Sequence, residues 1–431
     1  MERFTSRLTT VLTMVGVAVG LGNVWRFPYM MGSHGGSAFL FVYLFFVVVF
    51  GIPAVMGEWA LGRETRGGPV QAFAQAWGRA GRAIGALLVV NVVVANSYYL
   101  VVIAGIVYSA GFSVIRGFGE ETHAAYASGL SSFPLQAALS LALLALCLLV
   151  LRRGLVRGIE KVSRIFVPLF GLVVLVLILH AMTLPGAMRL TGEFLRPDFS
   201  GLGAREIFAA MGQAIFSLSL GGTFFLAYGS SLREEESLGP PAILTALGDV
   251  GSSLLAALFL VPAILVYGLD LASGPDLVFQ TFPRLFAEMP LGRVAGSLFL
   301  LVLGLVAFLS AVAALHVARQ ALVALGVGPT RALLLLGIAE SVLLLPSAHD
   351  GRIIGILDLY CGSGMQCLGC GLALLALTWG VGKARVLQQL GPSGKGARGR
   401  FLFFWLRWGV PSGLFAVLVL YVLQKSGMLG D

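Results

Sequence analysis

Residues 13–29, TMVGVAVGLGNVWRFPY, begin like a membrane helix and then interrupt their own apolar pattern. Three glycines crowd into seven positions, and Asn23 and Arg26 follow them before a proline. Glycine inside a helix costs about 1 kcal/mol relative to alanine, and a charge at bilayer depth marks a functional site by default. Backbone freed by such a break persists in a membrane only where protein buries it or where it lines a polar cavity. We therefore predict an unwound hinge over residues 18–23 that binds a ligand, with close helix packing of the glycines as the alternative.

The whole chain has the composition of a polytopic membrane protein. Of its 431 residues, 58% are hydrophobic and 11% are charged, and the mean hydropathy is +0.93. A helix needs about 20 apolar residues to cross a bilayer. About eleven such segments lie near residues 8–30, 37–61, 84–115, 134–151, 162–183, 205–232, 240–268, 294–325, 332–346, 353–381 and 402–424. The sequence thus predicts an all-α membrane protein in one domain, residues 1–431.

Basic residues divide unequally between the loops on the two sides of these segments. With the N-terminus inside, twenty of the 29 Lys and Arg residues fall in cytoplasmic loops, eight fall in outer loops, and Arg26 remains. Cytoplasmic loops of membrane proteins carry such an excess. This bias explains the net charge of +9 better than nucleic-acid binding does. We predict a multi-pass plasma-membrane protein with a cytoplasmic N-terminus and no nucleic-acid partner.

A second segment, residues 211–227, MGQAIFSLSLGGTFFLA, is interrupted by polar residues and by a pair of glycines. It is the sixth segment, five after the first interrupted one. Two glycine-interrupted spans at corresponding places in two halves indicate a transporter with its site at the midplane. We predict an inverted repeat of five plus five helices, residues 1–183 and 205–381, with 402–424 as an eleventh helix.

An amphipathic stretch, residues 275–290, PDLVFQTFPRLFAEMP, lies between the seventh and eighth segments. It is too short to span a bilayer. We predict that it rests over the outer mouth of the protein like a lid.

Six motifs between residues 18 and 221 support a resemblance that runs from about residue 3 to residue 425. They are AVGLGNVWRFPY at 18–29, HGG at 34–36, GIPAVMGEWALGR at 51–63, the tyrosines Tyr98 and Tyr99, RGLVRGIEK at 153–161 and GQAIFSLSLG at 212–221. With these motifs the chain resembles the neurotransmitter:sodium symporters, in particular bacterial amino-acid transporters with the leucine-transporter-like fold. The resemblance implies one or two sodium ions as the only cofactors.

For the first sodium ion, the resemblance implies four ligand residues, Ala18, Asn23, Ser217 and Asp249. Asp249 stands where the family has an asparagine. Many animal members need chloride, and bacterial relatives place a carboxylate nearby instead. Asp249 looks like that carboxylate, so no chloride requirement is expected, and the alternative is a capping or loop aspartate.

For the second sodium ion, the resemblance implies three carbonyls and one hydroxyl, those of Gly16, Val19, Ala307 and Ser310. Ala311 stands where the family usually has a second hydroxyl, which predicts a weaker site. His316, one turn further along, is either a core histidine or a proton site.

The resemblance implies a substrate site formed by Ala18, Gly20, Leu21, Gly22, Ala95, Tyr99, Phe216, Ser217, Ser219, Gly222, Ala311 and Leu315. The amides of Leu21 and Gly22 and the Tyr99 hydroxyl would bind an α-carboxylate. Monoamine carriers of the family have an aspartate where this chain has Gly20, so Gly20 leaves room for the carboxylate of an amino acid.

The side chain of the substrate would occupy a wide pocket lined by Ala95, Gly222, Ala311 and Leu315. A large apolar or aromatic amino acid is therefore expected. Replacing Gly222 by Phe is expected to shift the preference toward smaller substrates.

Two gates are implied. On the outside, Tyr99 and Phe216 would cover the substrate and Arg26 would pair with Asp358, while Glu58 would brace the second break or be a mere helix-end glutamate. The inner gate departs from the family pattern. Its expected basic, aromatic and acidic residues are replaced by Met1, Phe4, Leu325 and Ser231.

We therefore expect sodium-coupled symport of an apolar or aromatic amino acid by alternating access, carried out in the lipid bilayer by a monomer or weak dimer. One alternative is the same fold driven partly by protons, as Ala311 and His316 suggest. Another is a non-transporting amino-acid sensor that retains the pocket. An enzyme is least expected, because the sequence shows no nucleophile–base pair and no metal cluster.

Overall fold

The computed structural model describes residues 7–234, 236–274 and 276–425, and the regular structure in those ranges is entirely helical. In chain order the α-helices are α1 (Arg7–Ala18), α2 (Phe27–Ser33), α3 (Ser37–Phe46), α4 (Ile52–Thr65), α5 (Pro69–Ile115), α6 (Glu120–Leu130), α7 (Phe133–Arg152), α8 (Lys161–Met182), α9 (Ala187–Phe194), α10 (Ala204–Ser217), α11 (Phe224–Gly229), α12 (Gly239–Val266), α13 (Phe282–Glu288), α14 (Gly292–Ala324), α15 (Pro329–His349), α16 (Arg352–Leu357), α17 (Met365–Leu375), α18 (Lys383–Gln389), α19 (Gly396–Phe404) and α20 (Val410–Lys425). The predicted all-α architecture is confirmed.

Most of the predicted membrane segments are single long helices. Nine helical stretches in the described part are long and apolar enough to cross a bilayer, and Leu8–Ala18 with Gly22–Ser33 forms a tenth, bent by 64° at its break. The predicted sixth segment consists of the short helices α10 and α11, so its crossing stays a prediction. Helix α5 begins fifteen residues earlier than the predicted segment, but its backbone turns at Trp77 and Gly78 before the long apolar part.

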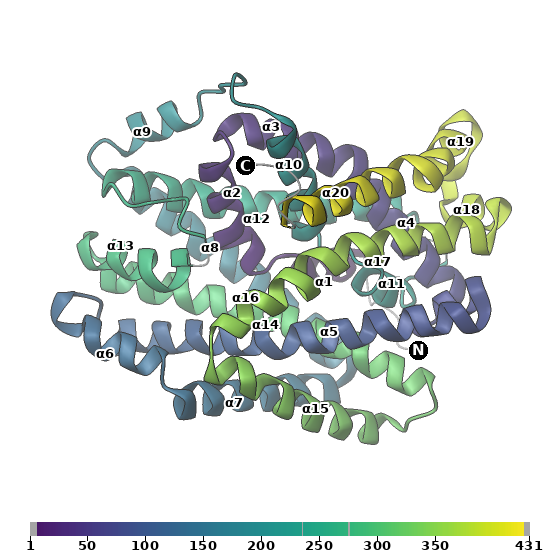
Figure 1. Ribbon diagram of the computed structural model, residues 1–431, viewed down its shortest axis with the longest axis horizontal. Coiled ribbons are helices and arrows are strands. Elements are labelled where there is room, and N and C mark those ends of the chain that lie inside the picture. The colour runs from purple at the N-terminus through teal and green to yellow at the C-terminus, as the bar shows by residue number, and fades with distance from the viewer. Residues whose placement is uncertain (1–6, 235, 275, 426–431) are drawn as a thin grey trace.

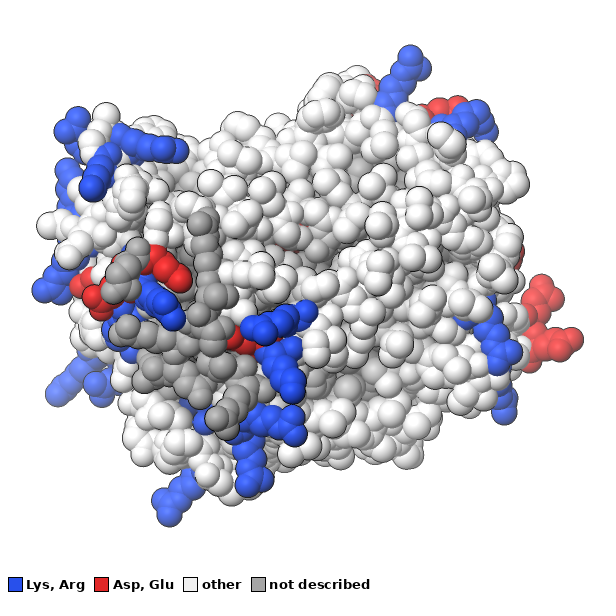
Figure 2. Space-filling view, turned by 180° about the vertical axis from the view of Figure 1, so that it is seen from behind, with Lys and Arg blue, Asp and Glu red and all other residues white. Residues whose placement is uncertain are grey.

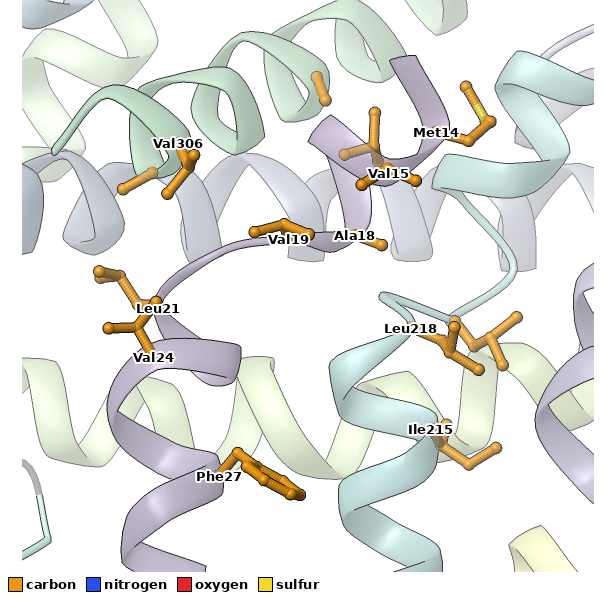
Figure 3. Close-up of a cluster of buried hydrophobic side chains, with 14 of the residues drawn as sticks. Met14, Val15, Ala18, Val19, Leu21, Val24, Phe27, Ile215, Leu218 and Val306 are labelled. Atoms are coloured by element: carbon orange, nitrogen blue, oxygen red, sulfur yellow. The ribbon is translucent and has the colours of Figure 1, made fainter. Parts of the chain in front are cut away.

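The first break is narrower than predicted. Helix α1 ends at Ala18, only Val19 and Gly20 leave helical geometry, and a wide π-helical turn, Gly22–Arg26, leads into α2. The predicted hinge over residues 18–23 is therefore longer than the observed one, because Leu21 already has helical dihedral angles. Figure 3 shows the chain leaving α1 at Ala18 and running through Val19 toward Leu21, with Ile215 of α10 and Leu218, just after α10, on the neighbouring broken segment.

The second break separates α10 from α11 over residues 218–223. Ser219 and Gly222 have positive φ angles of 53° and 69° there. The amides of Gly221 and Gly222 donate hydrogen bonds of 3.0 and 2.8 Å to Oε1 of Glu58, which is fully buried in α4. Glu58 thus replaces the helical carbonyls that these two amides have lost.

Figure 1 places α6, α9 and α13 at one end of the molecule and α18 and α19 at the other. We call these the outer and inner ends, after the topology predicted from the loop charges. Figure 2 shows Lys and Arg gathered toward the inner end and a middle region almost without charged side chains. That distribution fits a protein whose middle lies in lipid.

Candidate ligand-binding site

A cavity of about 1050 Å³ extends from the two breaks toward the outer end. Nine of the twelve predicted substrate residues line it, namely Ala18, Gly20, Leu21, Gly22, Ala95, Tyr99, Phe216, Ser217 and Ser219. Gly222, Ala311 and Leu315 are buried and are not among its lining residues. The cavity wall includes further side chains that the sequence analysis did not select, among them Asn91, Met365 and Gln366.

Gly222 faces the backbone of α17 instead of the cavity. A Cβ atom added to it would lie 2.5 Å from the carbonyl oxygen of Gly369, and its φ of +69° is unfavourable for other residues. The expectation that Gly222→Phe would tune substrate size is therefore wrong, because there is no room for a side chain at this position. The direction in which Gly222 points depends on the turn of the break, which the sequence pattern did not reveal.

Gly222→Ala is expected to destabilise the protein, whereas Gly221→Ala is the matched control. The left-handed conformation alone costs on the order of 1–2 kcal/mol for a residue with a Cβ, and the contact with Gly369 adds to it. At Gly221 the nearest atom would be 3.5 Å away, which is ordinary contact. Thermal unfolding of the detergent-purified variants measures the difference. Equal melting temperatures would contradict this geometry of the break.

A cluster of oxygen atoms converges on the side chain of Asn23 at the first break. Its Nδ2 lies 2.6 Å from Oδ1 of Asp249, 2.9 Å from Oγ of Ser253, 3.2 Å from Oγ of Ser217 and 3.2 Å from the carbonyl oxygen of Asp249. Ser217 also donates a 2.5 Å hydrogen bond to Oδ2 of Asp249. Asn23, Ser217, Asp249 and Ser253 are all buried. Four oxygens thus surround one amide nitrogen that has two hydrogens to donate.

This oxygen cluster fits a hard cation. Sodium prefers carbonyl, hydroxyl and carboxylate oxygens, and a carboxylate would balance its charge. Asn23, Ser217 and Asp249, three of the four residues expected for the first sodium ion, meet here. The fourth, Ala18, precedes the break and lines the adjoining cavity.

Of the four residues expected for the second sodium ion, the structure brings Val19 and Ser310 into direct contact. The Ser310 hydroxyl donates a 3.3 Å hydrogen bond to the Val19 carbonyl. Gly16 lies where α1 packs against α8 and α14, since an added Cβ would be 3.2–3.3 Å from Val167, Leu309 and Ser163. Ala307 is fully buried in α14.

Three polar residues next to the oxygen cluster were not selected from the sequence as site residues. Tyr43 lies within hydrogen-bonding distance of Ser217, at 3.3 Å between the two hydroxyl oxygens. Ser253 follows Asp249 by one helical turn, so the spacing in α12 was a usable signal. Gln213 precedes Ser217 by one turn in α10, and within the part of the chain that the structure describes both polar atoms of its buried side chain lack a hydrogen-bond partner. Nothing in the sequence around Tyr43 pointed to this cluster.

Gly20 lies close to the side chains of Ser310 and Tyr99. A Cβ atom there would lie 3.2 Å from Oγ of Ser310 and 3.3 Å from the hydroxyl of Tyr99. The Tyr99 hydroxyl is itself hydrogen-bonded to the backbone of Leu21 and to Ser310. The break thus presents its backbone and one hydroxyl to the cavity without an intervening side chain.

Of the four predicted outer-gate residues, Tyr99, Phe216 and Asp358 line the cavity and Arg26 contacts Phe216. The predicted ion pair between Arg26 and Asp358 is not formed. The guanidinium carbon of Arg26 lies 3.9 Å from the ring centroid of Phe216. Asp358 accepts a 3.1 Å hydrogen bond from the Tyr98 hydroxyl. Among the described residues, no ion pair joins Arg26 to Asp358. In this conformation Arg26 therefore contacts the predicted gate by stacking on the ring of Phe216.

The outer end of the cavity is lined by the amphipathic stretch predicted to act as a lid. Asp276, Val278, Phe279, Gln280 and Arg284 contribute to the wall. Most of them lie in the π-helical turn Leu277–Thr281 and in α13, so the stretch is helical and does not span.

The HGG motif forms the turn between α2 and α3. Gly35 and Gly36 have φ angles of +88° and +61°, which explains the glycines. His34 Nδ1 lies 3.8 Å from Oε1 of Glu206 at the start of α10, and burial lowers the pKa of His34. The turn thereby joins the outer ends of the two broken segments.

At the inner end, arginines of α4 join α4 to the loop that precedes α12. Arg63 donates to the carbonyls of Arg233 and Glu236 at 3.1 and 2.6 Å, and to both the side chain and the carbonyl of Gln389. Arg66 lies 2.8 Å from Glu234. Of the inner-gate positions noted in the sequence, Met1 and Phe4 lie outside the described residues, Leu325 is exposed, and Ser231 is buried.

Comparison with known proteins places this geometry in context. The model of the Sodium:neurotransmitter symporter family matches residues 1–118 and 118–427. The chain is 31% identical over 298 residues to the uncharacterised sodium-dependent transporter YhdH of Bacillus subtilis, covering 68% of this chain and 66% of that protein. It is 32% identical over 345 residues to an uncharacterised sodium-dependent transporter of Methanocaldococcus jannaschii, covering 75% and 70%. The aligned part thus spans about two thirds of the length of these relatives.

A solved structure matches the chain over almost its full length. The crystal structure of MhsT in complex with L-phenylalanine superimposes with a TM-score of 0.88 at 28% sequence identity. The match covers 97% of this chain and 99% of MhsT. The helical arrangement described above is therefore also that of MhsT.

Proposed function

Because the chain belongs to the sodium:neurotransmitter symporter family, we propose that it transports an apolar or aromatic amino acid across the plasma membrane, coupled to sodium. One or two sodium ions enter from outside with the substrate, and the site then opens to the cytoplasm by alternating access. The two interrupted segments belong to the two halves of an inverted repeat, residues 1–183 and 205–381. Members of the family are transporters and not enzymes.

The observation that carries this proposal is the oxygen cluster of Asn23, Ser217 and Asp249 beside the open backbone of the first break. Sodium in this cluster would be held by oxygens of Ser217 and Asp249 and by Oδ1 of Asn23, whose side-chain amide would have to turn so that Oδ1 replaces Nδ2, with the carbonyl of Ala18 as a further ligand. The chemistry that it supplies is a positive charge at the floor of the cavity. An anionic group of the substrate would bind next to that charge.

The carboxylate of an amino acid suits the backbone at Leu21 and Gly22. A helix resumes at Leu21, and the N-terminal end of a helix favours an anion. Gly20 has no side chain to occupy that place, and the Tyr99 hydroxyl lies beside it. The match to a structure containing L-phenylalanine supports an aromatic or apolar substrate.

The side chain of the substrate would extend from the breaks into the cavity beside Ala95. Each buried methylene contributes about 0.8 kcal/mol, so large apolar side chains bind better until the space is full. Gly222, Ala311 and Leu315 do not line the cavity as predicted. The wall beside the substrate's side chain would therefore be formed by Ala95 of α5 and by Met365 and Gln366 at the start of α17.

Uptake into proteoliposomes tests the proposal. An imposed sodium gradient is expected to drive accumulation of labelled phenylalanine or leucine, and a potassium gradient is not. Leu, Met, Phe, Tyr and Trp are expected to compete, while Gly, Ala and charged amino acids compete weakly. Tyramine, which lacks the carboxylate, is expected to bind at least about tenfold worse than tyrosine.

Three outcomes would overturn the proposal. Preferred binding of glycine or of a monoamine would contradict the predicted substrate. Equal uptake in sodium and potassium would contradict sodium coupling. Binding without accumulation would instead identify a sensor.

A further inference from the structure

A buried carboxylate lies in the membrane-spanning part of the molecule, away from the sodium cluster. Glu340 is the one acidic residue of α15, and its side chain is fully buried between α15 and α5. Asn96 of α5 donates a 3.1 Å hydrogen bond to its Oε1. Its other oxygen, Oε2, has no hydrogen-bond partner, and it makes no ion pair among the described residues. An acidic residue in such a place is expensive and marks function by default.

The side chain of Asn96 also has one polar atom that makes no hydrogen bond to the described residues. Its Nδ2 bonds to Glu340, while its Oδ1 is also buried and has no hydrogen-bond partner in the described ranges. A carboxylic acid and a carboxamide can exchange two hydrogen bonds, one in each direction. One proton on Oε2 of Glu340 would give that oxygen a hydrogen to donate and give Oδ1 of Asn96 the donor that it lacks. A single added proton therefore satisfies both unpartnered atoms.

This pair lies directly beside the outer cavity. Asn96 is only 3% exposed but belongs to the cavity wall, together with Gln136 of α7 and Ser347 of α15. Ser347 follows Glu340 by two helical turns, so both lie on the same face of α15. Polar side chains of Ser347, Gln136 and Asn96 thus belong to the cavity wall, while Glu340 is not among the residues that line the cavity.

We propose that Glu340 is a proton-binding site that is loaded from the outer cavity through Asn96, and that its proton must be bound before the cavity closes over the substrate. The step is a proton transfer only. One O–H bond of a hydronium ion in the cavity water breaks, one O–H bond forms on the carboxylate oxygen, a neutral water molecule stays behind, and no electron is gained or lost. This inference rests on the proposed transport function.

Coupling to the substrate site follows from the position of Asn96 in α5. Ala95 precedes it, and Tyr98 and Tyr99 follow it within one turn, so three of its neighbours line the same cavity. Oε2 of Glu340 and Oδ1 of Asn96 are already buried in this conformation, and closing the cavity would remove the remaining water beside Asn96 as well. A charged carboxylate with an unpartnered oxygen is then disfavoured, whereas the neutral acid paired with Asn96 is not. Substrate binding and proton binding must therefore favour each other by the same factor.

Other titratable groups around Glu340 are accounted for. Helices α5, α7, α14 and α16 pack against α15. From α7, the buried thiol of Cys147 lies near enough to interact electrostatically with Glu340. The remaining groups of these helices and of α15 have other neighbours or face the surface. Tyr98 bonds to Asp358, Tyr99 to Leu21, Tyr108 to the carbonyls of Ala125 and Tyr126, Arg293 to Val114, Arg319 to Leu151, and Arg352 to Asp350, while His316 packs on Tyr228. The side chains that are exposed are those of Arg79, Arg82, Arg152, Arg331 and His349.

Sodium-driven uptake measured over a range of external pH tests the proposal. The uptake rate of the unmodified protein is expected to fall toward alkaline pH. Above the pH at which this one group loses its proton, the rate should fall by about tenfold per pH unit. Glu340→Gln, whose amide can pair with Asn96 as the neutral acid does, is expected to lose that alkaline fall. Glu193→Gln, at an exposed carboxylate of α9, is the matched control and should keep the profile of the unmodified protein. Cys147→Ala should keep it as well, which separates the carboxyl from the thiol.

A second measurement does not depend on transport. In weakly buffered solution containing sodium, adding substrate to the purified protein is expected to take up protons, and Glu340→Gln should abolish this uptake. Infrared spectra should show the carbonyl band of a protonated carboxyl that disappears in Glu340→Gln. Matching pH profiles and proton uptake in the two proteins would overturn the proton site alone. Absence of sodium-driven uptake at every pH would overturn the proposed transport function instead.

Discussion

Asn23→Ala is expected to abolish the sodium dependence of substrate binding. Asn23 is the centre of the oxygen cluster: its Nδ2 faces Asp249, Ser217 and Ser253, and its Oδ1 accepts a 3.0 Å hydrogen bond from the amide of Gly20. Alanine would remove a proposed sodium ligand, leave the buried Asp249 without one of its donors, and free the amide of Gly20 at the substrate site.

The size of this effect follows from the coupling between the two ligands. Coupling free energies between sites are typically about 1–3 kcal/mol, or about 5–150-fold in affinity. We expect the unmodified protein to bind phenylalanine at least about tenfold more tightly in sodium than in potassium. In Asn23→Ala the two affinities should be equal. Equilibrium binding of labelled substrate in the two buffers measures this ratio.

Asn91→Ala is the matched control for Asn23→Ala. Asn91 also lines the cavity, but it donates a 3.0 Å hydrogen bond to the carbonyl of Cys361 and is remote in sequence from both breaks. Its replacement is expected to leave the ratio between sodium and potassium unchanged. A sodium ratio that survives in Asn23→Ala would show that the cation binds elsewhere.

Asp249→Asn is expected to make transport depend on chloride. Asp249 is fully buried and accepts hydrogen bonds from Asn23 at 2.6 Å and from Ser217 at 2.5 Å. In the proposed site its negative charge balances that of sodium, so the unmodified protein should transport equally well in chloride and in gluconate. Asparagine keeps the shape and removes the charge. Uncompensated charge in a buried site costs several kcal/mol, so uptake by Asp249→Asn in gluconate should fall by at least about tenfold.

Added chloride should restore part of that loss, because an anion can supply the missing charge beside Tyr43, Ser253 and the unpartnered amide of Gln213. Initial uptake rates of both proteins in sodium chloride and sodium gluconate measure the effect. Ser252→Ala is the control, since the Ser252 hydroxyl bonds to the carbonyl of Gly248 in its own helix. Strict chloride dependence of the unmodified protein would contradict the role proposed for Asp249.

Composition along the chain is enough to single out several residues of the site. The glycines of the two breaks, Asn23 and Ser217 stand out because each violates the composition of a membrane helix. Asp249 stands out for the same reason, inside an apolar segment. The fold brings Asn23, Ser217 and Asp249 together across more than 220 residues. The family that their motifs indicated is confirmed by the family match.

Other residues could not be placed from the sequence. Gly222 was expected in the substrate pocket and instead faces Gly369, because the positive φ angles of the break turn its Cα away from the cavity. Arg26 was expected to pair with Asp358 and instead stacks on Phe216. The pair of Glu340 and Asn96 was not foreseen, since 244 residues separate its members and neither belongs to a motif.

By itself, the sequence determined which segments are apolar enough to cross a membrane and which two of them are interrupted. Both depend on local physics: the bilayer requires long apolar segments, and glycine and polar residues weaken a helix at the positions where they occur. Tertiary structure alone decided which side chains meet. In a helix that is apolar on all sides, composition does not reveal which face points to a neighbour, so only the packing of helices brings Tyr43 to Ser217 and Asn96 to Glu340.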